Sequence, residues 1–339
     1  MNILVTGGAG FIGSHTTFAL IKENYKVVIL DNFSNSSEEI LKRISFQIGQ
    51  PITFINGDVR DYELIFKSLI DYKIGAVIHF AGLKSVNESL SIPINYYDNN
   101  VNGTLSLCKA MANAGVFNLT FSSSATVYGE QKNYPISEEQ IVGFTKNPYG
   151  RSKFIIEQIL KDIAISDNRW KIAILRYFNP IGAHESGTIG EVSQNIPENL
   201  MPYITQIALG RLKKLPIFGI DYETVDGTGV RDFIHVLDLA DGHVAALKAL
   251  KNKYGVHIWN LGTGKGYSVL QIIKAFENVS GKTIPYFIAP RRPGDIAISY
   301  ADPKKAEREL LWKAKHDLNK MIKDTWNWVV KNPDGFRKN

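Results

Sequence analysis

The chain has 339 residues, of which 44% are hydrophobic, and it carries a formal net charge of +6 and one cysteine. This length favours two domains or one large domain with a lobe, and a single cysteine excludes an intrachain disulfide and cysteine-based metal sites. No apolar run reaches the roughly 18 residues of a membrane span, and no basic segment is interleaved with aromatic residues, so we expect neither membrane insertion nor nucleic-acid binding.

Short β-branched runs alternate with amphipathic segments of helical length through the first half of the chain. These runs are almost continuously apolar, which is typical of parallel strands buried on both faces of a sheet. The pattern predicts an α/β fold in which helices cover both faces of a doubly wound parallel sheet. Strands are expected over residues 2–6, 26–30, 52–55, 76–80, 118–123 and 171–176.

The first strand is followed by TGGAGFIG, in which Gly7, Gly10 and Gly13 form the pattern G-x-x-G-x-x-G. Glycines at such a turn let the backbone approach a pyrophosphate at the N-terminus of the next helix. The second strand leads to Asp31, 18 residues after Gly13. A carboxylate there can bind the adenosine ribose diol and repel a 2′-phosphate. We therefore expect a Rossmann-type domain that binds NAD rather than NADP.

Polar and small residues follow the next three expected strands. Asp58 comes after the third strand, Ala81, Gly82 and Lys84 come after the fourth, and Ser124 comes after the fifth. The carboxyl ends of the strands are where doubly wound sheets bind their ligands. The sequence therefore predicts one site along this edge of the sheet.

The segment NPYGRSKFIIEQIL, residues 147–160, predicts a helix that is capped by its asparagine and has proline in the first position. At about 100° per residue, Tyr149 and Lys153 share an apolar stripe with Ile156 and Leu160, so both polar side chains should point into the protein. They would lie close together at the positive end of the helix dipole. This stretch alone is equally consistent with a core tyrosine beside a snorkelling lysine.

The alternation of strands and helices breaks after about residue 176, and residues 179–228 are richer in glycine, proline and asparagine. We expect an NAD-binding domain over residues 1–179, with a strand near 257–262 that returns to its sheet. A smaller C-terminal α/β substrate lobe would cover residues 180–339. The seven histidines show no metal-ligand spacing, so no metal site is expected.

Taken together, these motifs resemble the UDP-glucose 4-epimerases of the extended short-chain dehydrogenase/reductase superfamily. The similarity runs from Asn2 to about Trp328 and is carried by HFAGLKSV, YYDNNVNGT, FSSSATVYG, LRYFNPIGAH, NLMPYI, DGTGVRDFIHVLDLADGHV and APRRPGD, besides the glycine turn and Tyr149-x-x-x-Lys153. It implies an isomerase that uses NAD to invert C4 of UDP-hexoses through a 4-keto intermediate. It also implies a homodimer built on paired helices, for which residues 99–115 and the Tyr149 helix are candidates. Because the N-terminus lacks the basic and apolar regions of a signal peptide, we expect a cytoplasmic protein.

The resemblance also implies roles for individual residues. Tyr149 would be the catalytic base, with its phenolate favoured by Lys153, the helix N-terminus and the nicotinium charge, and Ser124 would bind the same sugar hydroxyl. NAD would contact Gly7, Gly10, Phe11, Ile12, Gly13, Asp31, Asn32, Asn35, Ser36, Asp58, Val59, Phe80, Ala81, Gly82, Lys84, Asn99, Ser122, Tyr149, Lys153 and Phe178. The UDP-sugar would contact Lys84, Ser124, Tyr149, Asn179, Asn199, Leu200, Pro216, Phe218, Arg231, Phe233, Arg292, Asp295 and Ser299.

Other activities found on the same scaffold require residues that can be checked in this sequence. Sugar-nucleotide dehydratases and decarboxylases carry an acidic residue before VYG, where this chain has Ala125 and Thr126. Tyr149 and Lys153 are also consistent with a plain dehydrogenase that releases NADH, although the UDP-binding motifs argue against it. A catalytically silent NAD-binding regulator would usually lack the tyrosine or the lysine.

Three positions depart from the enteric epimerase pattern. Phe11 and Phe233 stand where tyrosine is common, and they keep the ring while losing a hydroxyl. Ser299 matches a position that borders the pocket for the C2 substituent of the sugar, where enzymes restricted to UDP-glucose and UDP-galactose often have tyrosine. A small residue there implies that UDP-GlcNAc and UDP-GalNAc are also accepted, and restriction to the plain sugars is the alternative.

Overall fold

The computed structural model describes residues 1–192, 197–292 and 294–336. Its largest sheet has seven strands, and every pairing in it is parallel. The strand order, β10-β6-β5-β4-β1-β2-β3, reverses direction between β1 and β4, as in a doubly wound sheet. The strands are β1 (Asn2–Thr6), β2 (Lys26–Asp31), β3 (Thr53–Asn56), β4 (Ile74–His79), β5 (Asn118–Ser122), β6 (Lys171–Tyr177) and β10 (Gly255–Leu261).

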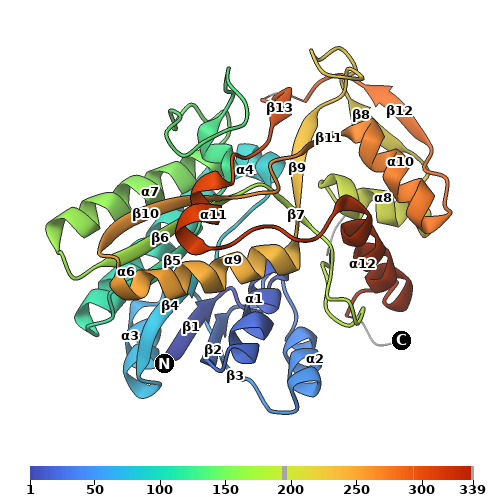
Figure 1. Ribbon diagram of the computed structural model, residues 1–339. Helices are drawn as coiled ribbons and strands as arrows, with labels where there is room; N and C mark the ends of the chain where they lie inside the picture. The colour runs from blue at the N-terminus through green and yellow to red at the C-terminus, as the bar shows by residue number, and fades with distance from the viewer. Residues whose placement is uncertain (193–196, 293, 337–339) are drawn as a thin grey trace.

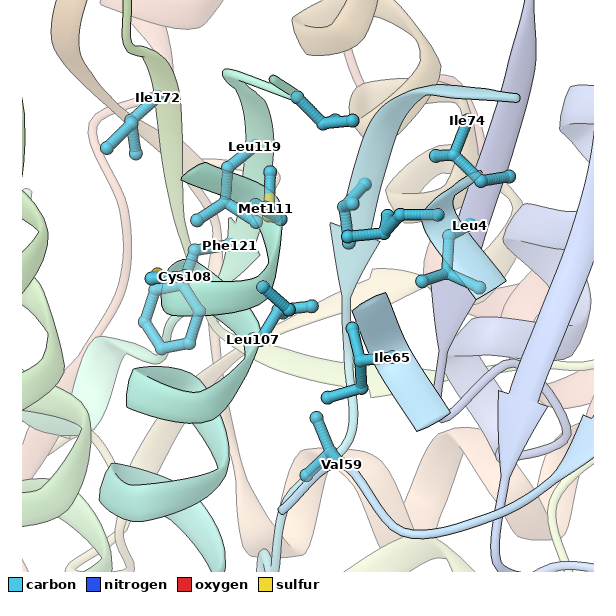
Figure 2. Packing of buried hydrophobic residues seen from close by; sticks show 14 of the residues in the cluster. Leu4, Val59, Ile65, Ile74, Leu107, Cys108, Met111, Leu119, Phe121 and Ile172 are labelled. Carbon is cyan, nitrogen blue, oxygen red and sulfur yellow. The ribbon is translucent and has the colours of Figure 1, made fainter. Parts of the chain in front are cut away.

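Side chains alternate between the two faces of this sheet, so each strand contributes to two separate cores. On one face, Leu4 packs with residues such as Ile65 and Met111 of α3 (Tyr62–Asp71) and α6 (Gly103–Asn113), as Figure 2 shows. Helix α7 (Pro148–Ser166) covers the same face. The opposite face carries α1 (Phe11–Lys22), α2 (Glu38–Ile48) and α9 (Val236–Ala249).

A smaller lobe stands beyond the carboxyl ends of these strands and gathers on one side of the molecule (Figure 1). Its core is formed by residues such as Met201, Ile217, Phe276 and Met321. Its helices are α8 (Leu200–Ala208), α10 (Val269–Ser280) and α12 (Leu318–Lys331), and its strands are β7 (Asn179–Ile181), β8 (Leu215–Phe218), β9 (Val230–His235), β11 (Gly266–Ser268), β12 (Tyr286–Ala289) and β13 (Ile298–Ser299).

Several short segments complete the fold. They are α4 (Val86–Ser91), α5 (Pro93–Tyr96), the π-helical turn η1 (Tyr97–Asn102), the 3-10 turns η2 (Ala125–Tyr128) and η3 (Leu250–Asn252), and α11 (Lys304–Leu310).

The prediction of a doubly wound parallel sheet is confirmed, and all six expected strands are present within a few residues of their expected bounds. The expected returning strand is β10, which pairs with β6 at the sheet edge. Helix α9 also returns to this sheet, where it packs against α1. Within the described ranges, no helix has the length and apolarity needed to cross a membrane.

Candidate active site

The glycine turn lies where β1 passes into α1, at the point where the strand order reverses. Gly7 has φ +68°, and a Cβ on it would lie 2.6 Å from the backbone nitrogen of Ala81. A Cβ on Gly13 would lie 2.2 Å from the carbonyl oxygen of Gly7, and the Gly10 amide donates to that oxygen (3.1 Å). The turn is thus folded too tightly for side chains, and it leads into the positive end of α1. This geometry suits a pyrophosphate held by backbone amides.

Asp31 at the end of β2 is buried beside this turn. One carboxylate oxygen accepts from the Ala9 amide (3.0 Å), and the other accepts from the Phe33 amide and the Ser36 hydroxyl (both 2.9 Å). The carboxylate therefore ties the glycine turn to the loop after β2. Ser36 and exposed Asn35 follow in that loop.

The loops after β2 and β3 meet through Asp58. Asn32 donates to its carboxylate (3.1 Å), and Arg60 pairs with it (2.8 Å). The hydrogen bond from Arg60 holds the pKa of Asp58 down at about 2. The next residue, Val59, is buried against Gly103 of α6. These loops extend the expected site along the β2–β3 side.

The loop after β4 is attached to the glycine turn on one side and to α7 on the other. The amides of Phe80 and Ala81 donate to the Thr6 carbonyl at 2.9 and 3.1 Å. A Cβ on Gly82 would lie 3.8 Å from Lys153 Nζ, so this loop adjoins the candidate lysine of α7. Lys84 is exposed and pairs with Glu191 across the opening towards the lobe (3.1 Å).

The candidate catalytic groups converge at the ends of β5 and α7. Lys153 Nζ donates to the Ser122 carbonyl (2.8 Å) and lies 4.9 Å from the centre of the Phe121 ring. Tyr149 and Ser124 are each 8% exposed. Asn147 caps α7 by accepting from the amide at position 150 (2.8 Å). The predicted burial of Tyr149 and Lys153 on one stripe of this helix is therefore observed.

The electrostatic expectation for the tyrosine needs correction. Burial raises the pKa of Tyr149, and the Ser124 hydroxyl opposes this only in part. Burial also lowers the pKa of Lys153 to about 8, because the ammonium has lost water. The sequence argument counted the cation and the helix dipole but not the desolvation of both groups. The protein groups alone therefore do not favour the phenolate.

The lobe presents its candidate residues on strands next to one another. In the sheet register Asn179 of β7 pairs with Phe233 of β9, and Ser299 of β13 pairs with Arg231 of β9. Phe233 and Ser299 are buried, and Arg231 forms an ion pair with Asp295.

A second group in the lobe lies on β8 and at the start of α8. Arg292 lies over the ring of Phe218, with its guanidinium carbon 3.8 Å from the ring centre. Burial lowers the pKa of Arg292, whereas Asp295 and Glu198 raise it. The remaining expected contacts are Pro216 on β8, Asn199 and Leu200 at the start of α8, Phe178 in the interior after β6, and Phe11 and Ile12 in the first turn of α1.

Two residues near the site, Asn100 and Tyr177, make contacts that no sequence pattern predicts. Asn100 is buried in the π-helical turn beside Asn99, and its side chain accepts from the Leu83 amide (2.8 Å) and donates to Ser152 of α7 (3.0 Å). Tyr177 at the end of β6 hydrogen-bonds through its hydroxyl to the Ser122 side chain. π-Helical turns are frequent at functional sites, but no residue pattern marks them. Among the described residues, no cluster of histidine, cysteine or carboxylate side chains is arranged to hold a metal ion.

Comparison with known proteins identifies the family. The model of the NAD dependent epimerase/dehydratase family matches residues 3–262. The UDP-glucose 4-epimerases of Neisseria meningitidis serogroup A and Bacillus subtilis are each 55% identical to this chain, over 99% of it and 99% of their own length. A UDP-glucose 4-epimerase from Bifidobacterium longum, solved in complex with NAD⁺ and UDP, superposes with a TM-score of 0.96 at 53% identity, covering 99% of this chain and 100% of that one. A UDP-Glc/GlcNAc 4-epimerase from Campylobacter jejuni superposes with a TM-score of 0.84 at 36% identity, covering 97% and 99%. The chain therefore belongs to the NAD dependent epimerase/dehydratase family and, within it, to the UDP-glucose 4-epimerases.

Proposed function

We propose that this protein interconverts UDP-glucose and UDP-galactose by inverting C4 of the hexose, and that it also accepts UDP-GlcNAc and UDP-GalNAc. The observation that supports this most is the convergence of Tyr149, Lys153 and Ser124 beside the glycine turn, opposite a lobe that carries Arg231 and Arg292. This arrangement supports a site in which NAD, a proton-transfer group and cations suited to a diphosphate act together.

NAD fits the residues of this edge. The tight turn at Gly7 and Gly13 leaves backbone amides free of side chains, and Asp31 is available to the adenosine ribose. Gly7, Gly13 and Asp31 would hold NAD⁺, and the cofactor would supply reversible hydride transfer at C4 of the sugar. Because the hydride is returned, the cofactor ends each cycle in its starting oxidation state.

Tyr149 supplies the matching proton transfer. Its phenolate would take the proton of the 4-hydroxyl as C4 is oxidised, and its phenol would give that proton back as C4 is reduced. Ser124 would orient the hydroxyl, and the Lys153 ammonium would stabilise the phenolate. Since burial raises the pKa of Tyr149, the Lys153 ammonium and the nicotinium charge of bound NAD⁺ have to compensate for the desolvation of the phenolate.

The nucleotide has to stay bound while the 4-keto sugar rotates to present its other face. Guanidinium groups pair with phosphate oxygens in a bidentate fashion, which suits Arg231 and Arg292 to the diphosphate. Asp295 orients the first arginine, and the ring of Phe218 supports the second. Such an arrangement anchors UDP firmly while leaving the 4-keto sugar free to present its other face.

The wider substrate range rests on Ser299. This residue is buried at β13, next to Arg231 in the sheet register, and its small side chain leaves room that a phenol ring would fill. A small residue admits an acetamido group without excluding a hydroxyl. If neighbouring Tyr300 fills this room instead, the enzyme is restricted to the plain sugars.

We also infer a homodimer formed through α6 and α7. Leu105 on α6 is 43% exposed, and Ile155 and Ile159 on α7 are only half-buried. Light scattering after size exclusion tests this inference, and a monomer at micromolar concentration would contradict it.

The decisive experiment incubates the purified protein separately with UDP-galactose and UDP-GalNAc and identifies the products by proton NMR. We expect UDP-glucose and UDP-GlcNAc, respectively, with no accumulation of NADH. If neither substrate is converted in the presence of NAD⁺, the proposed function is wrong. Conversion of UDP-galactose alone would contradict only the wider substrate range.

A further inference from the structure

A fully buried ion pair lies directly behind the candidate catalytic groups. Glu157 is 0% exposed and Arg176 is 1% exposed. The guanidinium contacts both carboxylate oxygens, from Nε (3.0 Å) and from Nη2 (2.6 Å). A pair this deeply buried is costly to desolvate and is weak evidence for stability in itself, so its location calls for another explanation.

The pair connects the elements that carry the site. Glu157 lies on α7, one turn after Lys153, which itself lies one turn after Tyr149. Its carboxylate also accepts from the hydroxyl of Ser123 (2.6 Å), the residue between Ser122 and Ser124 at the end of β5. One carboxylate therefore joins the helix that carries the base and lysine to the turn that carries the serine.

Arg176 extends the connection to the returning strand. Its Nη1 donates to the Tyr128 hydroxyl (3.1 Å), which donates to the Asn260 side chain on β10 (2.6 Å). The Asn260 amide nitrogen in turn donates to the Ile136 carbonyl (2.8 Å). Arg176 itself lies on β6, immediately before Tyr177, so the network also reaches the strand end beside Ser122.

We propose that Glu157 is a positioning residue for catalysis, which acts by locking α7 to the end of β5 through Arg176 and Ser123 and by keeping Lys153 cationic. This inference rests on the proposed function, because it assigns no new reaction. Glu157 is fully buried and acts through Ser123, Arg176 and Lys153.

The electrostatic part of the proposal follows from the surroundings of Lys153. Burial lowers the pKa of the lysine to about 8, and Glu157 raises it against this effect. From β4, His79 faces the ammonium, but burial keeps that histidine neutral by lowering its pKa to about 3. Tyr149 and Tyr177 are neutral because burial raises the pKa of each phenol. Glu157, attenuated by Arg176, is thus the anion that supports the charge on Lys153.

Glu157→Gln tests this support while keeping an acceptor for Ser123. Catalysis requires cationic Lys153, so the rate falls as the pH rises through the pKa of this lysine. Loss of the neighbouring carboxylate should move that alkaline limb of the kcat profile down by about one pH unit. The carbon-13 shift of the Lys153 ε-carbon, assigned with Lys153→Arg, should titrate lower by the same amount and does not depend on turnover.

Arg176→Lys tests the geometric part. It keeps a positive charge but loses the two-pronged contact with Glu157 and the bond to Tyr128. The alkaline limb should stay in place, whereas kcat should fall by about 10- to 100-fold, with little change in KM. The two variants thus separate the charge effect from the positioning effect.

Both variants leave a buried group poorly paired and should lower the stability of the fold. A control variant with a similar loss of stability is therefore needed. Asp324→Asn is the matched control, because Asp324 is also buried and pairs with His235 and Lys320 on α12, in the lobe rather than on α7. It should lower the unfolding midpoint without moving the alkaline limb or the Lys153 titration. If Glu157→Gln does not fold, the charge-free pair Glu157→Gln with Arg176→Met should show the same downward shift to a smaller extent.

Two results would overturn the proposal. One is a Glu157→Gln enzyme whose alkaline limb and Lys153 titration match the wild type while its unfolding midpoint falls as in Asp324→Asn. The other is an Arg176→Lys enzyme with unchanged kcat. A wild-type protein without epimerase activity would instead contradict the proposed function, and the Lys153 titration would still decide whether Glu157 supports the lysine charge.

Discussion

In the proposed mechanism, the hydroxyl of Tyr149 has to lose a proton near neutral pH although it is buried away from water. Burial raises the pKa of this phenol. Burial also lowers the pKa of Lys153, whose ammonium should stabilise the phenolate. A free phenol has a pKa of about 10, so each further unit of pKa adds about 1.4 kcal/mol to the cost of ionisation. In this proposal, the positive charge of NAD⁺ stabilises the phenolate and Glu157 stabilises the Lys153 ammonium, although neither group transfers the proton.

Replacing Tyr149 by phenylalanine removes only the proton-transfer group. We expect kcat to fall by about 10² to 10⁴-fold, because general acid–base catalysis contributes that much, while UDP affinity and the unfolding midpoint stay close to wild type. Stopped assays with UDP-galactose, together with calorimetric titration of UDP, measure both. Retention of near wild-type turnover would exclude Tyr149 as the base.

Ser299→Tyr should divide the two substrate pairs. In the proposed site, the ring would take the space that an acetamido group needs beside Ser299, so turnover of UDP-GalNAc should fall below detection while turnover of UDP-galactose changes little. Ser299→Ala is the control and should keep both activities. The steric explanation fails if wild type does not convert UDP-GalNAc, or if Ser299→Tyr leaves both rates unchanged.

At the scale of the elements, the sequence predicted those parts that have a strong local pattern. The strands β1, β2, β4, β5 and β6 are mostly buried apolar runs, and the glycine turn follows from its spacing. β3 is the exception, because it lies at the sheet edge with most of its residues exposed. The lobe strands are short, down to the two residues of β13, and they pair with segments distant in the chain, so no periodicity marks them.

The same limit applies to the candidate site. Its strand-end residues were predicted because parallel strands end at one edge. The contacts of Asn100 and the pairing of Lys84 with Glu191 depend on how separate segments meet in space. The residue roles at this edge stay predictions until the variants are measured.

The start of α1 can be tested through its last glycine. Gly13→Ala would bring a Cβ to 2.2 Å from the Gly7 carbonyl oxygen, so the turn has to open and its amides lose their arrangement. We expect the purified variant to carry much less NAD than the wild type, measured by absorbance and enzymatic assay after denaturation. Gly49→Ala at the end of α2 is the control: it is strained by φ +71° but touches nothing, so it should cost stability and spare NAD. Equal NAD content in Gly13→Ala and wild type would contradict the role of this turn.

For the molecule as a whole, three uncharged histidines are buried in and around the seven-stranded sheet. His15 on α1, His79 at the end of β4 and His243 on α9 are all buried. Burial lowers their pKa to about 3, 3 and 4, respectively. In the unfolded chain each would titrate near 6.5. Below that pH the unfolded state binds protons that the native state excludes, so the free energy of unfolding must fall as the solution is acidified.

The expected slope can be stated for the contribution of these three histidines between pH 6 and pH 5. Burial raises the pKa of Asp232 to about 6, so this carboxyl group takes up a proton in the native state over the same window and offsets part of their effect. Each buried histidine contributes about 1.4 kcal/mol per pH unit, so three should lower the free energy of unfolding by about 4 kcal/mol over this unit. Urea unfolding of the NAD-loaded protein at pH 7, 6 and 5 measures it. His243→Gln should remove about a third of the slope, because the ring nitrogen that bonds the Leu239 carbonyl is replaced by a side chain that does not titrate. A free energy of unfolding that is equal at pH 7 and pH 5 would mean that these histidines can take up protons without unfolding, and the interior of the domain would then have to be open to water on that timescale.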